Sequence, residues 1–264
     1  MLRGILAGLA AGALWGLVFV APRMVSGFSA VDLTAGRFAS YGLISIALVL
    51  ALWQRRRPTW SQAGAALGMS LLGFTAYYLL LALSIRAAGT EVPTLIIGTI
   101  PLWVMLLGKP GHLRWKTLVP GIALTAAGLA LMVSAVQGGT GPGLARAPGE
   151  FLRGVVLVTA SLACWTAFAL FNSAWLKRHP EVDVMDWAHW LGVATGLGAL
   201  VLWLVAGSSV AELAARPQLG RFVLVCVATG LGSAWLATIL WNVASRRLPA
   251  SLGGQLIVLS LIHI

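Results

Sequence analysis

Apolar residues occupy long runs along the chain, and short segments rich in charge, glycine or proline separate them. A membrane-spanning helix needs about 20 mostly apolar residues. The runs therefore predict eight membrane-spanning helices, at residues 5–25, 32–53, 62–86, 91–107, 116–136, 152–176, 184–206 and 221–245. A ninth run begins near residue 250 and extends to the end of the sequence. This pattern predicts an all-α polytopic membrane protein.

Composition agrees with the pattern. Charged residues make up 9% of the chain and hydrophobic residues 59%, whereas a soluble domain carries about 25% charged residues. The water-facing surface is therefore far smaller than a soluble domain needs. The two cysteines, Cys164 and Cys226, both lie inside apolar runs, which favours packing over a disulfide or a metal site. We expect no metal and no cofactor.

The net charge of +11 is better explained by membrane topology than by nucleic-acid binding, because the basic residues gather in short loops between apolar runs. With a cytoplasmic N-terminus, 11 Lys and Arg residues fall inside and 6 outside, while Arg37 falls within the membrane. The positive-inside rule then predicts that the N-terminus is cytoplasmic. Several tryptophans fall near the same cytoplasmic ends, where indole rings favour the headgroup layer: Trp53, Trp60, Trp115, Trp175 and Trp187.

The chain also shows signs of an internal repeat. Trp15 and Trp165 are 150 residues apart, and Asp32 and Asp183, which open the second and seventh predicted helices, are 151 apart. The stretch SIRAAGTEVPTLII, from residue 84, aligns with ASRRLPASLGGQLI at an offset of 160. Each match is short, but their order and near-constant offset agree.

The Gly/Pro-rich connector at residues 138–150 separates the two units, which cover residues 1–137 and 151–264. Five helices per unit is an odd number, so the second unit enters the membrane from the opposite side. Such inverted repeats are a common plan of secondary transporters.

Several stretches give the chain a recognisable order of motifs, and the order resembles the EamA family of the drug/metabolite transporter superfamily. They are AGRFASYG, LLLALSIRAAG, IIGTIPLWVMLLG, WKTLVPGIALTAAGLALM and WNVASRRLPASLGGQLIV. The resemblance runs from about residue 5 to Val258. It implies ten helices in two inverted five-helix repeats and transport of small metabolites, often outward. It brings no catalytic triad and no metal site.

The sequence departs from the family pattern at residues 259–264, LSLIHI. The family pattern continues there through a ninth helix to a tenth, so we expect the second repeat to be truncated after about eight and a half helices in all. The six residues are also a translation of a transposon end used to build sequencing libraries. An adapter artefact and a natural helix start are the two alternatives.

Arg37 is the sharpest candidate for function, because it lies inside an otherwise apolar run. The helical rise of 1.5 Å per residue puts it about 8 Å below the outer start of its helix. In one interpretation its long side chain reaches the outer headgroups. In the other it faces a wet cavity and binds an anionic or carboxylate-bearing substrate, since intramembrane charge usually lines a pathway. Tyr41, one turn deeper, is expected to share its face.

Aromatic residues near the middle of predicted helices form a second group of substrate-binding candidates. Trp15 and Trp165 are related by the repeat and carry N–H groups that need acceptors, so we expect them near the axis between the repeats, where such carriers bind substrate. Core packing is the alternative. Trp235, Tyr77 and Tyr78 are weaker candidates of the same kind.

Two further features concern helix shape and proton transfer. Pro101 follows Gly98 and Thr99 in the fourth predicted helix, where a proline removes a backbone hydrogen bond and breaks the helix.

Asp186 and His189 are three residues apart on one helical face and are candidates for proton coupling, since histidine titrates in the relevant range. The alternative is a capping carboxylate and a histidine at headgroup depth.

We therefore expect a secondary transporter, most simply an exporter of small metabolites or drug-like molecules, working by alternating access in the bacterial inner membrane. A polytopic membrane enzyme and a non-transporting scaffold are the alternatives. The enzyme is less favoured because no HExxH-type spacing is present, and no P-loop would let ATP drive the chain directly. Expected partners are a small-molecule substrate and the lipid bilayer, with homodimer formation left open and nucleic acid excluded.

Overall fold

The computed structural model describes residues 1–51, 57–108, 119–120, 123, 127 and 148–248. Most of the predicted helix at 116–136 and of the connector lies outside the described residues. The start of the ninth helix and residues 259–264 also lie outside them. Neither alternative for LSLIHI is therefore tested.

Within the described ranges, six helical segments are long and apolar enough to cross a membrane: Leu2–Met24, Ala30–Ala51, Trp60–Ala88, Gly149–Arg178, Val184–Ala206 and Leu219–Arg247. Each matches a predicted helix to within a few residues. In the most apolar window of each segment only 44–50% of the residues are buried, so the other half of each apolar surface faces outward. Apolar side chains that face outward fit a lipid environment, and the predicted all-α polytopic fold is confirmed.

The first half of the described chain contains the following elements: α1 (Leu2–Trp15), α2 (Leu17–Met24), α3 (Ala30–Ala51), α5 (Trp60–Ser70), the π-helix η1 (Leu71–Thr75), α6 (Ala76–Ala88), α7 (Glu91–Ile97) and α8 (Ile100–Leu107). The second half contains α10 (Pro148–Arg178), α11 (Val184–Ala206), α12 (Val210–Ala214), α13 (Leu219–Thr229), the π-helix η2 (Gly230–Leu236) and α14 (Ala237–Arg247). The short helix α12 was not predicted.

Polar residues fix where several helices begin. The Ser29 hydroxyl accepts from the Asp32 amide at 2.9 Å, and the Asp32 carboxylate accepts from the Ser29 amide, which starts α3. Thr59 and Gln62 form a capping box before α5. The Asp183 carboxylate accepts from the Met185 amide at the start of α11. These contacts satisfy N–H groups that a helix leaves unpaired at its N-terminus.

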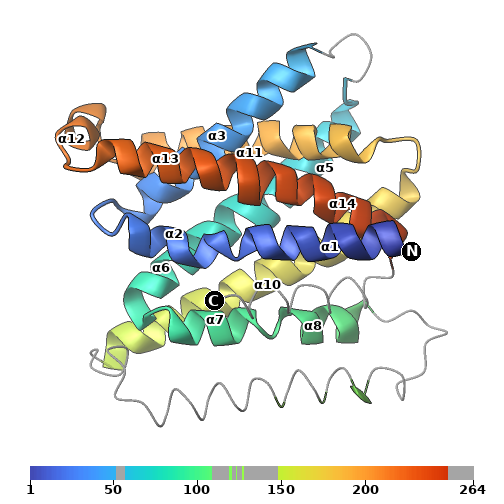
Figure 1. Ribbon diagram of the computed structural model, residues 1–264, viewed down its shortest axis with the longest axis horizontal. Helices are drawn as coiled ribbons and strands as arrows, with labels where there is room; N and C mark the ends of the chain where they lie inside the picture. The colour runs from blue at the N-terminus through green and yellow to red at the C-terminus, as the bar shows by residue number, and fades with distance from the viewer. Residues whose placement is uncertain (52–56, 109–118, 121–122, 124–126, 128–147, 249–264) are drawn as a thin grey trace.

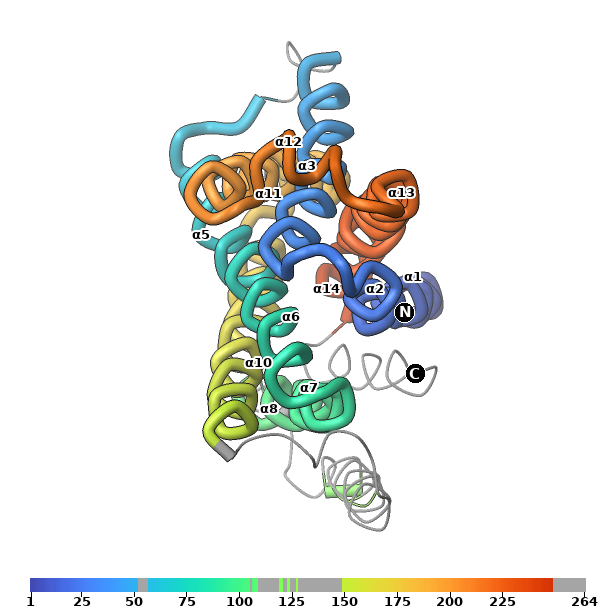
Figure 2. Tube along the Cα trace, turned by 90° about the vertical axis from the view of Figure 1, so that its left-hand side faces the viewer, coloured from blue at the N-terminus to red at the C-terminus, as the bar shows by residue number. Residues whose placement is uncertain are grey.

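The helices form a bundle in which α1 runs beside α14, α6 beside α10, and α3 crosses α11 (Figure 1). Figure 2 views the bundle after a turn of 90°, with α13 and α1 on one side and α5, α6 and α10 on the other. The pairs α1–α14 and α6–α10 are equivalent under the predicted repeat, since each joins the first helix of one half to the third helix of the other.

The crossing of α3 and α11 is a contact between two backbones. A Cβ atom added to Gly42 would lie 2.5 Å from the Cα of Gly196, and one added to Gly196 would lie 2.7 Å from the Cα of Gly42. Distances under 3 Å leave no room for a side chain. Close approach of small residues lets membrane helices pack tightly, and here it fixes where α3 meets the second half.

A π-helical segment interrupts the third helix of each half. In the first half η1 joins α5 to α6, and in the second half η2 joins α13 to α14. π-helical turns are rare and often lie at functional sites. Their occurrence at matching places is a second structural likeness between the halves.

A third likeness involves two arginines that the 160-residue offset aligns. Arg86, in the last turn of α6, donates to the carbonyl of Phe28 in the loop between α2 and α3. Arg246, in the last turn of α14, donates to the carbonyls of His179 and Val182 in the loop between α10 and α11. We call these contacts the first-half clamp and the second-half clamp. They lie at opposite ends of the bundle (Figure 1).

The fourth predicted span is two short helices, and its break precedes the proline. α7 ends at Ile97, Gly98 and Thr99 form the break, and Pro101 lies in the first turn of α8. The amide of Leu102 bonds to the Thr99 carbonyl at 2.9 Å, so the proline stands where a helix needs no N–H from it. Pro101 therefore starts a helix here.

One of the tryptophans near a basic loop is buried among the helices. Trp187 was expected at headgroup depth, but its side chain is fully buried, and its ring stacks on Trp175 with centroids 3.7 Å apart. Trp60, expected in the same layer, is 95% exposed. Trp53 and Trp115 lie outside the described residues. Proximity to a basic loop did not reveal that Trp187 faces the helices around it.

Candidate functional site

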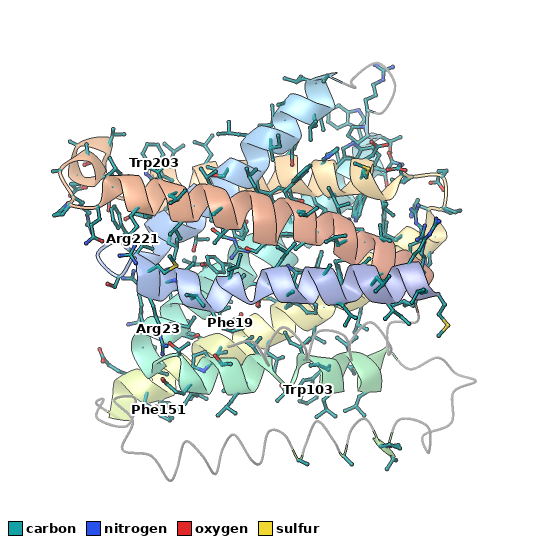
Figure 3. The ribbon with its side chains drawn as sticks, in the orientation of Figure 1. Phe19, Arg23, Trp103, Phe151, Trp203 and Arg221 are labelled. Atoms are coloured by element: carbon teal, nitrogen blue, oxygen red, sulfur yellow. The ribbon has the colours of Figure 1, made fainter. Side chains whose placement is uncertain are left out.

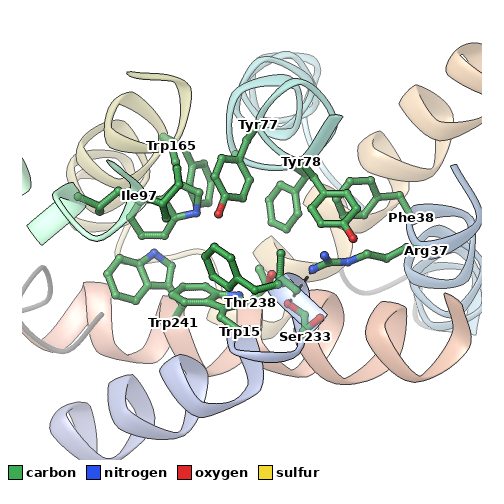
Figure 4. A pocket seen from close by; sticks show the side chains of 16 residues that line it. Trp15, Arg37, Phe38, Tyr77, Tyr78, Ile97, Trp165, Ser233, Thr238 and Trp241 are labelled. Carbon is green, nitrogen blue, oxygen red and sulfur yellow. Dashed lines mark hydrogen bonds between the residues drawn. The ribbon is translucent and has the colours of Figure 1, made fainter. Parts of the chain in front are cut away.

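A cavity lies in the middle of the bundle, between the two halves. Its empty volume is about 660 Å³, including space open to solvent. Figure 4 shows Arg37 entering from α3 at one end and Trp165 and Trp241 at the other. The described lining comprises Trp15, Val18, Phe19, Arg37, Phe38, Gly73, Phe74, Tyr77, Tyr78, Ile97, Ile100, Trp165, Phe168, Ser233, Thr238 and Trp241.

Arg37 is only 4% exposed, so its side chain lies inside the bundle and does not extend to the protein surface. Its guanidinium carbon lies 4.3 Å from the ring centroid of Tyr78 and 5.2 Å from that of Phe38. Nη2 donates to the Ser233 carbonyl at 3.5 Å, while Nε and Nη1 have no hydrogen-bond partner among the described residues. The cation is thus held by aromatic faces and one weak hydrogen bond.

The neighbouring acid does not neutralise Arg37 by hydrogen bonding. Asp32 lies five residues earlier on α3, and its carboxylate accepts from the hydroxyl of Ser29 at 2.6 Å. It also accepts from the amide and the hydroxyl of Ser208, each at 2.8 Å. These bonds tie the start of α3 to the loop after α11. Asp32 therefore serves the fold, and the guanidinium keeps free donors.

The π-helix η2 positions Arg37. A Cβ atom added to Gly230 would lie 2.5 Å from the Arg37 carbonyl oxygen, so the backbones of η2 and α3 touch at this residue. The Ser233 carbonyl that accepts from Arg37 belongs to the same segment. The other π-helix, η1, also reaches the cavity, through Gly73 and Phe74. Both irregular segments therefore help to build the lining.

Three indole rings gather at the end of the cavity opposite Arg37. The ring centroids of Trp15 and Trp165 are 5.5 Å apart, those of Trp15 and Trp241 5.3 Å, and those of Trp165 and Trp241 5.6 Å. Tyr77 extends the group, 6.5 Å from Trp165. These separations are typical of paired aromatic rings. We call Trp15, Trp165 and Trp241 the indole cluster.

The cavity brings together five of the residues predicted from the sequence: Trp15, Arg37, Tyr77, Tyr78 and Trp165. It does not include the other two aromatic candidates. Tyr41 is fully buried, and its hydroxyl donates to the Ala188 carbonyl at 2.6 Å, which links α3 to α11. Trp235 stacks on His189 with centroids 6.4 Å apart. The roles of all seven in substrate binding stay predictions.

Asp186 and His189 lie on α11 outside the cavity lining, and both are buried, at 8% and 4% exposure. The ring of His189 lies nearly parallel to that of Trp235. Both residues therefore face other protein elements. Their role in proton coupling stays a prediction.

Two buried asparagines join three helices next to this region. The Trp187 Nε1 donates to Asn172 Oδ1 at 2.7 Å, and Asn172 Nδ2 donates to Asn242 Oδ1 at 3.0 Å. Both asparagines are fully buried. Because these polar atoms bond to one another, the group holds α10, α11 and α14 together. Helix packing therefore accounts for both asparagines.

Trp241, Phe74, Ser233 and Thr238 line the cavity but were not singled out from the sequence. Trp241 lies only five residues before Arg246, near the end of its apolar run. Serine and threonine are common in membrane helices as packing residues. The repeat offered one usable signal, because Phe74 plus the 160-residue offset falls at Ala234, within the segment that supplies Ser233.

Comparison with known proteins adds three findings. The sequence profile of the EamA-like transporter family matches residues 2–136. The inner membrane protein YtfF of Escherichia coli (strain K12) is 32% identical over 274 aligned positions, which cover 98% of this chain and 84% of that protein. A solved crystal structure is 20% identical, covers 98% of this chain and 85% of that one, and superposes with a TM-score of 0.72. This last likeness shows the fold alone.

Proposed function

The chain belongs to the EamA-like transporter family, and on that premise we propose that it is a secondary transporter of small metabolites in the bacterial inner membrane. The family consists of transporters, and the chain is a multi-pass membrane protein. The observation that carries the proposal is the cavity between the halves, which contains a buried cation with free donors. Intramembrane charge of this kind usually marks a substrate pathway.

Alternating access is the mechanism we propose. It needs two halves that can exchange roles at the two membrane faces. The aligned π-helices η1 and η2 and the two clamps at opposite ends of the bundle support such an inverted repeat. In this mechanism the first-half clamp closes one face, the second-half clamp closes the other, and each opens in turn.

We further propose export, with the N-terminus in the cytoplasm. Figure 3 shows Arg23 and Arg221 at the end of the bundle opposite the N-terminus. In the predicted topology the denser basic loops lie on the same side of the membrane as the N-terminus, and the positive-inside rule then favours the cytoplasm for that side. Outward transport is the direction that the family resemblance implies.

The test is a metabolite profile of cells that overexpress the protein, compared with cells that express Arg37→Gln at the same membrane level. We expect at least one small metabolite to accumulate in the medium with the wild-type protein. The variant should not produce this accumulation. Identical profiles in the two strains and in cells without the protein would overturn the proposal.

A further inference from the structure

The geometry points to a substrate class: we propose that the cavity binds aromatic monocarboxylates, with the carboxylate at Arg37 and the ring beside the indole cluster. This inference rests on the proposed function and specifies it. Three features of the lining support it: the buried guanidinium of Arg37, the donor-rich polar atoms of the lining and the shape of the apolar part.

The charge argument concerns Arg37. A guanidinium that is 4% exposed retains two hydrogen-bonding nitrogens, Nε and Nη1, without partners among the described residues. Buried charges are normally paired, and a planar fork of donors matches the two oxygens of a carboxylate. A bound carboxylate would supply both the missing negative charge and the missing acceptors.

The remaining polar atoms of the cavity are rich in donors. The Trp241 Nε1 is buried without a hydrogen-bond partner among the described residues, and Tyr78 and Thr238 add hydroxyl groups to the lining. An indole N–H only donates, and a hydroxyl can donate. No aspartate or glutamate belongs to the described lining. An acceptor-rich anion therefore fits better than an amine, whose ammonium group would meet no carboxylate.

The apolar part of the lining selects the body of the substrate. Besides the indole cluster, aromatic rings from α2, α3, η1, α6 and α10 line the cavity (Figure 4). The rings of Tyr77 and Trp165 lie 6.5 Å apart and are tilted by 57°. A flat aromatic ring can pack edge-to-face or offset against such neighbours, which adds stabilisation beyond burial alone. The substrate is therefore an acid with a flat apolar body.

The experiment compares four probes of similar size with the purified full chain in detergent: 3-phenylpropanoate, 3-phenylpropan-1-ol, 2-phenylethylamine and L-phenylalanine. Binding is measured by isothermal titration calorimetry. We expect 3-phenylpropanoate to bind at least tenfold more tightly than the alcohol, because hydrogen bonds to a charged group are the stronger ones. Tighter binding of the amine or the zwitterion would overturn the inference.

Variants locate the site. Arg37→Gln should weaken binding of 3-phenylpropanoate by about 10- to 100-fold, and Arg37→Lys should weaken it less because the charge remains while the fork is lost. Trp241→Ala should weaken the acid and the alcohol alike. Arg221→Gln, an exposed control outside the cavity, should leave both affinities unchanged. Unchanged affinity in Arg37→Gln would overturn the inference.

Control measurements distinguish a folding defect from a loss of binding. Each variant is compared with the wild type by gel filtration and tryptophan fluorescence, and the Arg37→Lys protein provides a second folded variant. If the metabolite profile shows export but the exported compounds are amines or neutral molecules, the substrate class fails while the proposed function stands. If 3-phenylpropanoate binds at Arg37 but no metabolite is exported, the proposed function fails instead.

Discussion

Replacing Arg37 by methionine should separate stability from function. Methionine keeps an apolar stem of similar length and removes the charge. Arginine near the centre of a membrane helix costs about 2.5–3.5 kcal/mol. The guanidinium recovers part of this through the ring of Tyr78, 4.3 Å away, and through one hydrogen bond of 3.5 Å.

The contacts that the substitution removes are weak. A cation–π contact of this kind is worth about 1 kcal/mol, and a long hydrogen bond about 0.5 kcal/mol. The relief of the buried charge is larger, so Arg37→Met should raise the free energy of unfolding by about 1–2 kcal/mol. The same variant should lose transport. A gain in stability with a loss of function is expected where a residue is kept for its ligand.

The assay is unfolding of the purified protein in mixed micelles with increasing SDS, followed by the fluorescence of its 12 tryptophans. Arg23→Met is the matched control. Arg23 is exposed and pairs with Glu91 at 3.2 Å, and surface pairs contribute about 0–1 kcal/mol, so this variant should barely change the unfolding curve. Destabilisation of Arg37→Met by 1 kcal/mol or more would refute the reasoning, because it would show that the guanidinium is satisfied within the fold.

Three other outcomes follow from the packing. Gly42→Ala should lower the free energy of unfolding by about 1–3 kcal/mol, because the added Cβ has no space. Gly68→Ala has open space around it and should raise the free energy of unfolding by up to about 1 kcal/mol. Equal effects of the two substitutions would contradict this prediction. Asn172→Ala should cost about 2–4 kcal/mol in the same titration, since it leaves two buried partners unpaired. Arg86→Gln and Arg246→Gln should each speed hydrogen exchange only in the loop that the arginine holds; faster exchange in both loops of one variant would argue against two separate clamps.

The spans of the helices were predictable because lipid imposes a length and an apolar composition on each of them. Helix starts were predictable where a capping residue precedes the run, as at Asp183. The π-helices were not predictable. A π-helical turn has one extra residue, and an apolar sequence gives no pattern that predicts it. The structural setting of the π-helices is seen only in the packing of Gly73 against Phe168 and of Gly230 against Arg37.

The candidate site was predictable in outline. The buried arginine and the repeat-related tryptophans stood out because each violates the expectation for its surroundings, and all three line the cavity. Tyr41 shows the limit of helical periodicity. Its spacing from Arg37 suggested a common face, but the crossing with α11 captures its hydroxyl at Ala188. Tertiary packing decides which neighbour a helix face contacts. The spacing of residues along one helix does not predict that neighbour.

The contact between Gly42 and Gly196 has a mechanical consequence for the bundle. No side chain separates the two backbones. One helix can therefore rotate against the other at that point without any side chain changing its rotamer. The contact is therefore suited to be the fulcrum of any rocking movement between the halves. A bulky residue at either position would push the two helices apart and hold the carrier in one conformation, while the cavity stayed intact.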